Sequence, residues 1–424
     1  TPSDNLKWTW SGWFKRSVLS LGMMLSYCYT SGGEGGPEIR SGNTIRFRNW
    51  ISNAAEGNYL TTQLLRDVSS WYHLVLVYDS ANGTAGNRIR MYLNGKEITD
   101  FGTEENPDQN QACTHNSAIE HSIGSYRDSS NYYDGYMAEI VFCDGQAYAA
   151  SDFGEFNSDS PTLWQPKDPS GLTFGDNGYW LGFEDSSALG NDVSGENNDW
   201  TPANLAAADQ ATDTPTNSFA TMNPLAGNGT YTEGNLIVTG GNNVVSTFGV
   251  NAGRWYCECK ITLASGALYP LIGIADSANP FATSPGASGY PGSHTPSYGI
   301  FGNGSLYANG SNEGDQGFSD FADNDIIGMY LDLDSGTKTI KWHVNGTEVA
   351  TDNISAPDSS YVFGHYTGGE SAVVGAWNFG GCPPFTISSA NSDPNGYGSF
   401  EYSTSESSID YYALCTKNLA EHGG

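Results

Sequence analysis

The stretch that decides the fold is WYHLVLVYDSANGTAGNRIRMYLNGKEI at residues 71–98, and its plan returns in IIGMYLDLDSGTKTIKWHVNGTEV at residues 326–349. In both, an apolar run ends in Asp, a Gly-containing turn follows, and alternating residues lead through an Asn-Gly pair into a last short strand. An Asn-Gly pair between alternating runs is the strongest short-range signal for a β-hairpin. Asn94-Gly95 and Asn345-Gly346 therefore predict related antiparallel β domains in the two halves of the chain.

The composition fits this plan. Of 424 residues, 53 are glycine and 13% are aromatic, whereas only 15% are charged. Many short strands joined by Gly, Asn and Ser turns give such a profile, and no stretch keeps the 3.6-residue apolar period of a helix. We expect an all-β protein with two antiparallel β-sandwich (jelly-roll) domains in series, joined by an irregular connector.

The spacing of the strand-like runs sets the expected boundaries. The first sandwich is expected at residues 1–150 and the second at 236–385. Residues 151–235, rich in Asn, Asp, Ala, Thr and Pro, are expected to form an extended connector along a domain surface, since it contains apolar residues that need burial: Trp200, Phe219 and Leu225. Residues 386–424 look like a tail or linker. The missing initial Met and this linker-like end predict a segment of a longer polypeptide.

The charge excludes two classes of partner. Against 47 acidic residues stand only 17 basic ones, which gives a formal net charge of −30, and no Lys/Arg cluster exists. Phosphate groups need concentrated positive charge, so we expect neither nucleic acid nor an anionic membrane surface as a partner. No apolar run reaches 18 residues, so no membrane insertion is expected. The acidity favours solubility, and acidic rims that bind Ca²⁺ are the alternative.

The seven cysteines have no framework spacing: Cys28, Cys113, Cys143, Cys257, Cys259, Cys382 and Cys415. No CxxC pairs with a second CxxC, so the spacing predicts buried free thiols and no zinc site. Cys257 and Cys259 alternate along one strand and share a face. The residue between them, Glu258, is expected on the solvent side.

The sequence offers no catalytic residues. A glycosidase needs two carboxylates facing a sugar across a cleft. The strand YMAEIVF supplies only Glu139, while Asp332 and Asp334 are expected to end a strand and open a turn. His73 is expected to pack beside Trp71, and no nucleophile elbow or phosphate loop is present. We therefore predict that the protein is not an enzyme.

Two stretches resemble known domains. Trp71-x-His73, the Tyr78-Asp79 strand end, RIRMYLNG at 88–95 and DGYMAEIVFCDGQAY resemble the laminin-G/pentraxin-like branch of the concanavalin-A-type sandwiches. The second half resembles a SPRY domain in GRWYCEC at 253–259, LIGIAD at 271–276, YGIFGNG at 298–304, DIIGMYLDLD at 325–334 and KWHVNG at 341–346. Together the two domain resemblances cover about two-thirds of the chain.

A narrower resemblance concerns the order of the parts. TWSGWFKRS, YMAEIVFCDGQAYAASDFGEF, FEDSSALGNDVSGENNDWT and DTPTNSFATMNPL are similar to segments of bacteriophage structural proteins of the tail-fibre type. Those proteins place a laminin-G-like domain, a connector of this kind and a SPRY-like domain in series. The resemblance implies a virion surface or extracellular location.

Candidate ligand residues follow from the loops and from the resemblance. Exposed aromatic rings stack on sugars, and the loops supply Tyr132, Tyr133, Tyr290, Tyr298 and Tyr366. Laminin-G-like domains often bind Ca²⁺ at a rim through Asp side chains and carbonyls, which implies calcium as a cofactor candidate with Asp79 and Asp134 as its ligands.

The expected function is a non-enzymatic virion structural or adhesion protein that binds host-surface glycans or proteins. We expect a homo-oligomer, associated with other virion or filament subunits, because multivalent display raises avidity. Two alternatives remain open: a subunit of an extracellular microbial filament or adhesin, and a secreted carbohydrate-active enzyme, which the missing acid pair disfavours.

Overall fold

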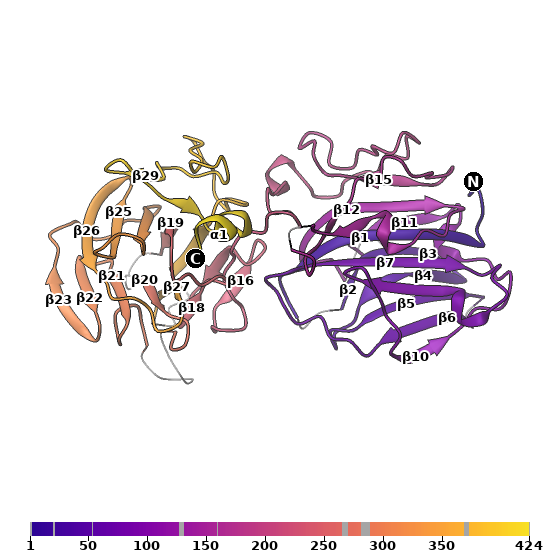
Figure 1. Cartoon of the computed structure of the whole chain (residues 1–424), viewed down its shortest axis with the longest axis horizontal. Coiled ribbons are helices and arrows are strands. Elements are labelled where there is room, and N and C mark those ends of the chain that lie inside the picture. Colours follow the sequence, from indigo (N-terminus) through magenta and orange to yellow (C-terminus); the bar gives the residue numbers. More distant parts are fainter. Residues whose placement is uncertain are drawn as a thin grey trace. The chain divides into compact units, whose positions relative to one another are not determined.

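The computed structural model describes residues 2–19, 22–52, 54–126, 131–158, 160–264, 270–280, 289–368 and 373–423. The regular secondary structure of these residues is nearly all β-strand, arranged in antiparallel sheets, which confirms the all-β fold class. The chain divides into two compact units, Thr1–Gln210 (unit 1) and Ala211–Gly424 (unit 2) (Figure 1).

Unit 1 is a sandwich of two sheets, as far as the described residues go. One sheet has the order β15 (Tyr179–Leu181), β12 (Gly135–Asp144), β1 (Lys7–Arg16), β7 (Trp71–Asp79), β8 (Ile89–Leu93) and β9 (Lys96–Glu97). The facing sheet has the order β10 (Phe101–Glu105), β6 (Ala54–Thr61), β5 (Ile45–Ile51), β4 (Gly33–Ile39), β3 (Ser26–Thr30) and β11 (Glu120–Ile123), with β2 (Met23–Met24) beside β4. Short elements complete it: β13 (Gly154–Phe156), β14 (Trp164–Pro166) and the 3-10 helices η1 (Ala85–Asn87), η2 (Thr114–Asn116), η3 (Ala150–Asp152) and η4 (Ala207–Asp209).

The central strand β1 is buried on both faces, which explains its aromatic richness. Its even positions Trp8, Trp10 and Phe14 enter the core between the sheets, where Trp8 stacks on Tyr78 at 5.5 Å between ring centroids. On the other face, Trp13 stacks on His73 at 4.4 Å. A strand apolar on both faces requires a cover on its outer side.

Residues 150–174 supply that cover, and the expected connector belongs to unit 1 as far as Gln210. Phe153, Trp164 and Phe174 pack on the outer cluster around Trp13, and β15 extends the sheet beside β12. His73 is fully buried and accepts a hydrogen bond from Trp164 Nε1 at 2.9 Å. The connector was expected to lie along a domain surface, and its first part packs on the apolar outer face of this sheet.

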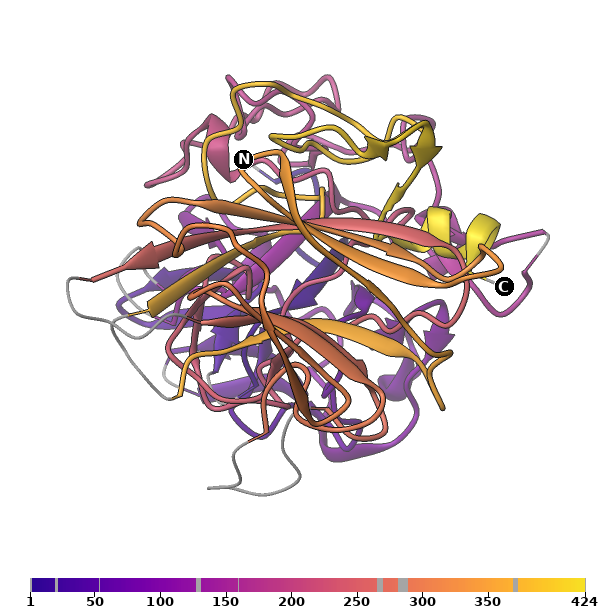
Figure 2. The same cartoon turned by 90° about the vertical axis from the view of Figure 1, so that its left-hand side faces the viewer.

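Unit 2 is likewise a two-layered sandwich in the part of the chain that is described (Figure 2). One sheet has the order β16 (Thr230–Thr232), β17 (Ile237–Thr239), β28 (Val373–Asn378), β19 (Arg254–Leu263), β24 (Ile326–Asp332), β25 (Thr339–Val344) and β26 (Thr347–Asn353), with β31 (Tyr412–Ala413) parallel to β19. The other has the order β18 (Val244–Val245), β27 (Tyr361–Tyr366), β20 (Leu271–Asp276), β21 (Ser297–Phe301), β22 (Ser305–Ala308) and β23 (Ser311–Asp315). The strands β29 (Ser405–Glu406) and β30 (Ile409–Asp410) and the helix α1 (Thr416–His422) follow.

The end of the chain belongs to unit 2, contrary to the expected tail or linker. Tyr411, Leu414 and Cys415 are buried at 1% exposure or less. Phe219, from the other end of the expected connector, is buried in the same cluster as Tyr411 and Cys415, whereas Leu225 is 60% exposed and does not need the burial expected of it. The cluster covers Tyr256 and Tyr330 on the outer side of the sheet.

Glu258 anchors this cover, and its expected solvent position is wrong. The side chain is fully buried, and each carboxylate oxygen accepts two hydrogen bonds. Oε1 accepts from the Tyr256 hydroxyl at 2.9 Å and from the backbone N–H of Tyr402 at 2.8 Å. Oε2 accepts from Asn378 Nδ2 at 3.0 Å and from the backbone N–H of Glu401 at 3.1 Å. Cys257 and Cys259 do share the opposite face, in the core.

Both predicted hairpin turns are confirmed. Asn94-Gly95 joins β8 to β9, and Asn345-Gly346 joins β25 to β26, and both strand pairs are antiparallel. Asn94 and Gly95 have φ of 48° and 77°, and Asn345 and Gly346 have φ of 49° and 79°. Positive φ at both turn residues is the type I′ geometry, which Asn-Gly adopts at little cost. The described cysteines are all free thiols, buried except for the half-buried Cys382.

The Glu258→Gln variant should unfold at a lower temperature than the wild type. Glutamine keeps the size of the side chain but replaces one acceptor oxygen by a donor, so two of the four donors lose their partner. Buried polar groups left unsatisfied cost about 1–3 kcal/mol each. Calorimetry of the full chain would measure the shift. The exposed Glu313→Gln change in the same unit is the control, and equal melting behaviour of the two variants would contradict the role given to Glu258.

Candidate functional site

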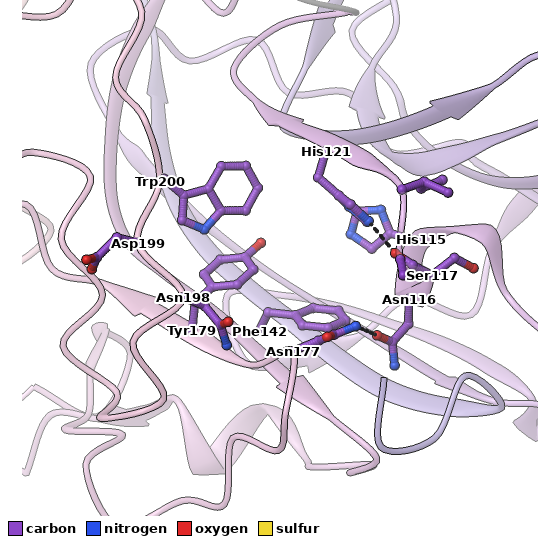
Figure 3. A pocket seen from close by; sticks show the side chains of 12 residues that line it. His115, Asn116, Ser117, His121, Phe142, Asn177, Tyr179, Asn198, Asp199 and Trp200 are labelled. Carbon is purple, nitrogen blue, oxygen red and sulfur yellow. Dashed lines mark hydrogen bonds between the residues drawn. The ribbon is translucent and has the colours of Figure 1, made fainter. Parts of the chain in front are cut away.

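A pocket of about 260 Å³ lies at one edge of the unit 1 sandwich (Figure 3). It forms where η2 and β11 approach β12, β15 and the loop that follows β15. The described residues that line it are mostly aromatic or amide-bearing: His115, Asn116, Ser117, Ala118, Ile119, His121, Phe142, Asn177, Tyr179, Asn198, Asp199 and Trp200.

The buried carboxylate of Asp144, the last residue of β12, holds two of the residues that line this pocket, Asn116 and Asn177. Its Oδ1 accepts hydrogen bonds from Asn116 Nδ2 at 2.6 Å and from the backbone N–H of Asp4 at 3.1 Å. Its Oδ2 accepts from the backbone N–H groups of Ser3 and Asn177, the latter at 3.2 Å. Three segments distant in sequence therefore converge on one side chain.

The same contacts position two amide side chains for a ligand. Asn177 Nδ2 donates to Asn116 Oδ1 at 3.2 Å (Figure 3). Asn116 is buried, whereas Asn177 is half-buried at the pocket. A fixed pair of amides offers donors and acceptors in a set geometry, and this is how small-molecule sites orient polar ligands.

Three aromatic rings form the opposite wall. Phe142 stacks on Tyr179 at 5.7 Å between centroids, and Tyr179 meets the edge of Trp200 at 5.0 Å. Phe142 and Tyr179 are buried, but Trp200 is only half-buried. The Trp200 ring is thus the aromatic surface open to a ligand.

The loop that carries Trp200 is latched to β15. The backbone N–H of Trp200 donates to the Gly190 carbonyl at 2.8 Å, and a Cβ at Gly190 would lie 1.9 Å from the Trp200 carbonyl oxygen. Asp192 accepts from the backbone N–H groups of Trp180 and Asn198, each at 2.9 Å. The close approach requires glycine at position 190.

Two histidines close the remaining side, and both are neutral at pH 7. Burial lowers the pKa of His115 to about 3, and the neighbouring His121 adds to this effect. The backbone oxygen of Gly35 acts in the opposite direction and raises the pKa. Burial also lowers the pKa of His121, although its hydrogen bond to the Ser117 carbonyl at 3.0 Å acts to raise it. The rings lie 5.6 Å apart.

The described lining of the pocket does not contain the carboxylate pair of a glycosidase. Asp199 is the single carboxylate among the described lining residues, whereas glycosidases use two. Glu139 lies outside the lining, where it accepts a hydrogen bond from Trp180 Nε1 at 2.6 Å. Burial raises the pKa of Glu139, although the hydrogen bond from Trp180 acts to lower it. Asp332 accepts from Ser335 and Asp334, so its expected turn role is confirmed.

The tyrosines nominated in unit 1 lie outside this pocket. Tyr132 is 56% exposed. Tyr133 is half-buried, packs edge-on against Phe14, and donates its hydroxyl hydrogen to the Lys15 carbonyl at 2.8 Å. Tyr133 therefore fastens the strand ends, and only Tyr132 keeps the exposure that a stacking role needs.

The nominated tyrosines of unit 2 have two different roles. Tyr298 is 1% exposed, and its hydroxyl accepts hydrogen bonds from the Ser355 N–H and Asn309 Nδ2, so it belongs to the core. Tyr290 and Tyr366 are half-buried neighbours with ring centroids 5.8 Å apart. Tyr307, which was not among the nominated residues, has its ring centroid 5.5 Å from that of Tyr290.

The two acids nominated for calcium cannot share an ion. Asp79 pairs with Lys7 at one end of β1, while Gly135, next to Asp134, pairs with Arg16 at the other. Nine residues of strand separate these ends by about 30 Å. The residues do not fit a common Ca²⁺ site. The resemblance to laminin-G-like domains implies a Ca²⁺-binding rim, but it does not tell which acidic residues lie together there.

The pocket residues carried little signal in the sequence. Trp200 was marked only as apolar, and Asn116 and Asn177 are two among many asparagines. Their grouping depends on Asp144, whose partners lie up to 141 positions away. A buried acid at a strand end, next to an Asn-rich segment, was the one available hint.

Comparison with known proteins locates the first domain. Residues 1–149 match a family model described as the concanavalin A-like lectin/glucanases superfamily. The search of curated proteins gives no match. The match covers about a third of the chain and includes His115, His121 and Phe142 of the pocket but not Tyr179 or Trp200.

Solved structures give distant likenesses. The SPRY domain of human HERC1 is 18% identical, with a TM-score of 0.30, covering 39% of this chain and 99% of that one. A putative carbohydrate binding protein from Bacteroides ovatus is 17% identical, with a TM-score of 0.31, covering 45% and 50%. Domains LG4-5 of the mouse laminin alpha1 chain are 12% identical, with a TM-score of 0.26, covering 84% and 74%. At these scores the likenesses say nothing of function. No helix among the described residues is long and apolar enough to cross a membrane.

The free energy of unfolding should fall as pH drops below about 6.5. An unfolded histidine has a pKa near 6.5, and His115 has a folded pKa of about 3. Between these values the unfolded state binds more protons, so stability is lost on acidification, by about 2 kcal/mol per such residue between pH 6.5 and 5. Denaturant unfolding of unit 1 at pH 7 and 5 measures the slope.

The His115→Asn variant should lose the part of the pH dependence of the unfolding free energy that His115 contributes. His365→Asn in unit 2 is the matched control, since His365 has a pKa of about 4 through burial, and its effect should fall on unit 2. An unchanged slope in the His115 variant would show that this ring is protonated in the folded state.

Proposed function

We propose that the protein is a non-catalytic glycan-binding adhesion protein and that the unit 1 pocket holds one sugar residue. The observation that carries the proposal is the half-buried Trp200 ring facing the Asn116–Asn177 amide pair across the pocket. Sugars have an apolar face and an equatorial ring of hydroxyls. An aromatic surface stacks on the apolar face, and fixed amides opposite it form hydrogen bonds with the hydroxyls.

The charges around the pocket favour a neutral sugar. The described lining contains Asp199 but no Lys or Arg, and the chain carries a formal net charge of −30. An acidic sugar would meet repulsion with no cation to offset it. Hexoses and N-acetylhexosamines are therefore the expected ligands, and sialic or uronic acids are not.

Display on a virion appendage is the setting we propose for this binding. The support is the similarity of four segments to phage structural proteins, together with two rigid sandwiches in one chain. A single pocket of this size binds weakly, so we also propose a homo-oligomer. Linked copies raise avidity by about 10²–10⁴ without new contacts.

The Trp200→Ala variant should lose at least about tenfold in affinity for the preferred sugar. A base–aromatic or comparable ring-stacking contact contributes on the order of 1–3 kcal/mol. The measurement starts with a glycan array on the wild-type chain, followed by calorimetric titration of the best neutral ligand.

Tyr132→Ala is the matched control, since this ring is exposed in the same unit and lies outside the pocket. It should bind as the wild type does. Equal affinity of the Trp200 variant and the wild type, or a preference for acidic sugars, would refute the proposed site.

A further inference from the structure

Below the histidine side of the pocket, three metal-ligating side chains come together. Cys28, His115 and His121 each offer a ligand atom, and these atoms all lie within 4.8 Å of one another. Cys28 and His121 are direct cross-strand partners on β3 and β11, so they share a face of the sheet. His115 reaches the same place from η2.

The histidine ring nitrogens are already arranged as in metal sites. His121 Nε2 donates to the Ser117 carbonyl at 3.0 Å, and His115 Nε2 lies 3.4 Å from Ser26 Oγ. Metal-bound histidines usually engage their second ring nitrogen in this way, which fixes the ring and its tautomer. The arrangement leaves Nδ1 of each ring to bind a metal.

His115 Nδ1 is the observation that points to a ligand. Its side chain is 2% exposed, and among the described residues no hydrogen bond of normal geometry reaches this nitrogen. A buried polar atom left unsatisfied costs about 1–3 kcal/mol. Simple core packing does not explain why this cost is carried beside a thiol and a second imidazole.

We infer that Cys28, His115 and His121 bind a zinc ion. One thiolate and two neutral imidazoles form a donor set that suits Zn²⁺, whereas Ca²⁺ and Mg²⁺ take oxygen. In a tetrahedral Zn²⁺ site the ligand atoms lie about 3.3–3.8 Å apart, so small side-chain adjustments close the cluster. Water from the pocket supplies the fourth ligand, because both histidines line it.

Binding changes one proton and no oxidation state. The Cys28 thiol, which donates to the Gly35 carbonyl at 3.4 Å, loses its proton to solvent as the S–Zn bond forms. Each imidazole binds through a ring nitrogen that carries no proton and keeps its other N–H. The ion would join edge strand β11 to β3 and tie η2 to both. No CxxC pattern marks this site in the sequence, because the donors are 87 and 6 residues apart along the chain.

Titration of the reduced, chelator-treated full chain with Co²⁺, and Zn²⁺ in competition, tests the inference. We expect one metal per chain, a thiolate-to-cobalt charge-transfer band and the visible bands of tetrahedral Co²⁺. Cys28→Ala should remove the charge-transfer band and weaken binding at least ~10–100-fold. His121→Gln, at a half-buried edge position, should weaken binding by a similar factor.

Cys143→Ala is the matched control, a buried thiol of unit 1 outside the cluster. It should bind as the wild type does. Circular dichroism checks the fold of each variant, and His121→Gln decides the matter if Cys28→Ala unfolds. Absence of one-to-one binding in the wild type, or unchanged binding in the folded variants, would overturn the inference. No sugar is present in this titration, so its result is independent of the proposed function.

Discussion

A buried carboxylate with four hydrogen-bond donors holds each sandwich to its irregular segments. In unit 1 this group is Asp144, and in unit 2 it is Glu258; each oxygen of each group accepts two hydrogen bonds. A buried anion needs such compensation, because an unsatisfied charge is far more costly than a neutral group. The sandwiches supply the framework, but these two side chains decide how the loops lie on it, and the proposed binding pocket is made of those loops.

The hairpins could be predicted because their signal is local. Asn94-Gly95 and Asn345-Gly346 adopt positive φ wherever they occur between alternating strands, so the turn type follows from two adjacent residues. The outer cover of each sheet was not predictable in this way. Trp13 and Tyr256 each face outward on a central strand, and which segment packs on them depends on contacts between distant residues.

The candidate site residues likewise divide into those that residue type suggests and those that long-range contacts bring together. Loop tyrosines were a reasonable prediction for sugar contact, but Tyr133 and Tyr298 use their hydroxyls to fasten backbone inside the protein. The pocket instead uses Trp200 and asparagines that Asp144 draws together. The metal cluster shows the same limit: Cys28 and His121 become neighbours only through the pairing of β3 with β11. Residue type suggested candidates, but long-range register selected among them.

The most direct test of the glycan-binding account is a crystal structure of the full chain with the preferred neutral oligosaccharide. The account predicts a sugar ring over the Trp200 indole, with its hydroxyls bonded to the Asn116–Asn177 side. Sugar density at the Tyr290–Tyr307–Tyr366 cluster of unit 2 with an empty unit 1 pocket would contradict it.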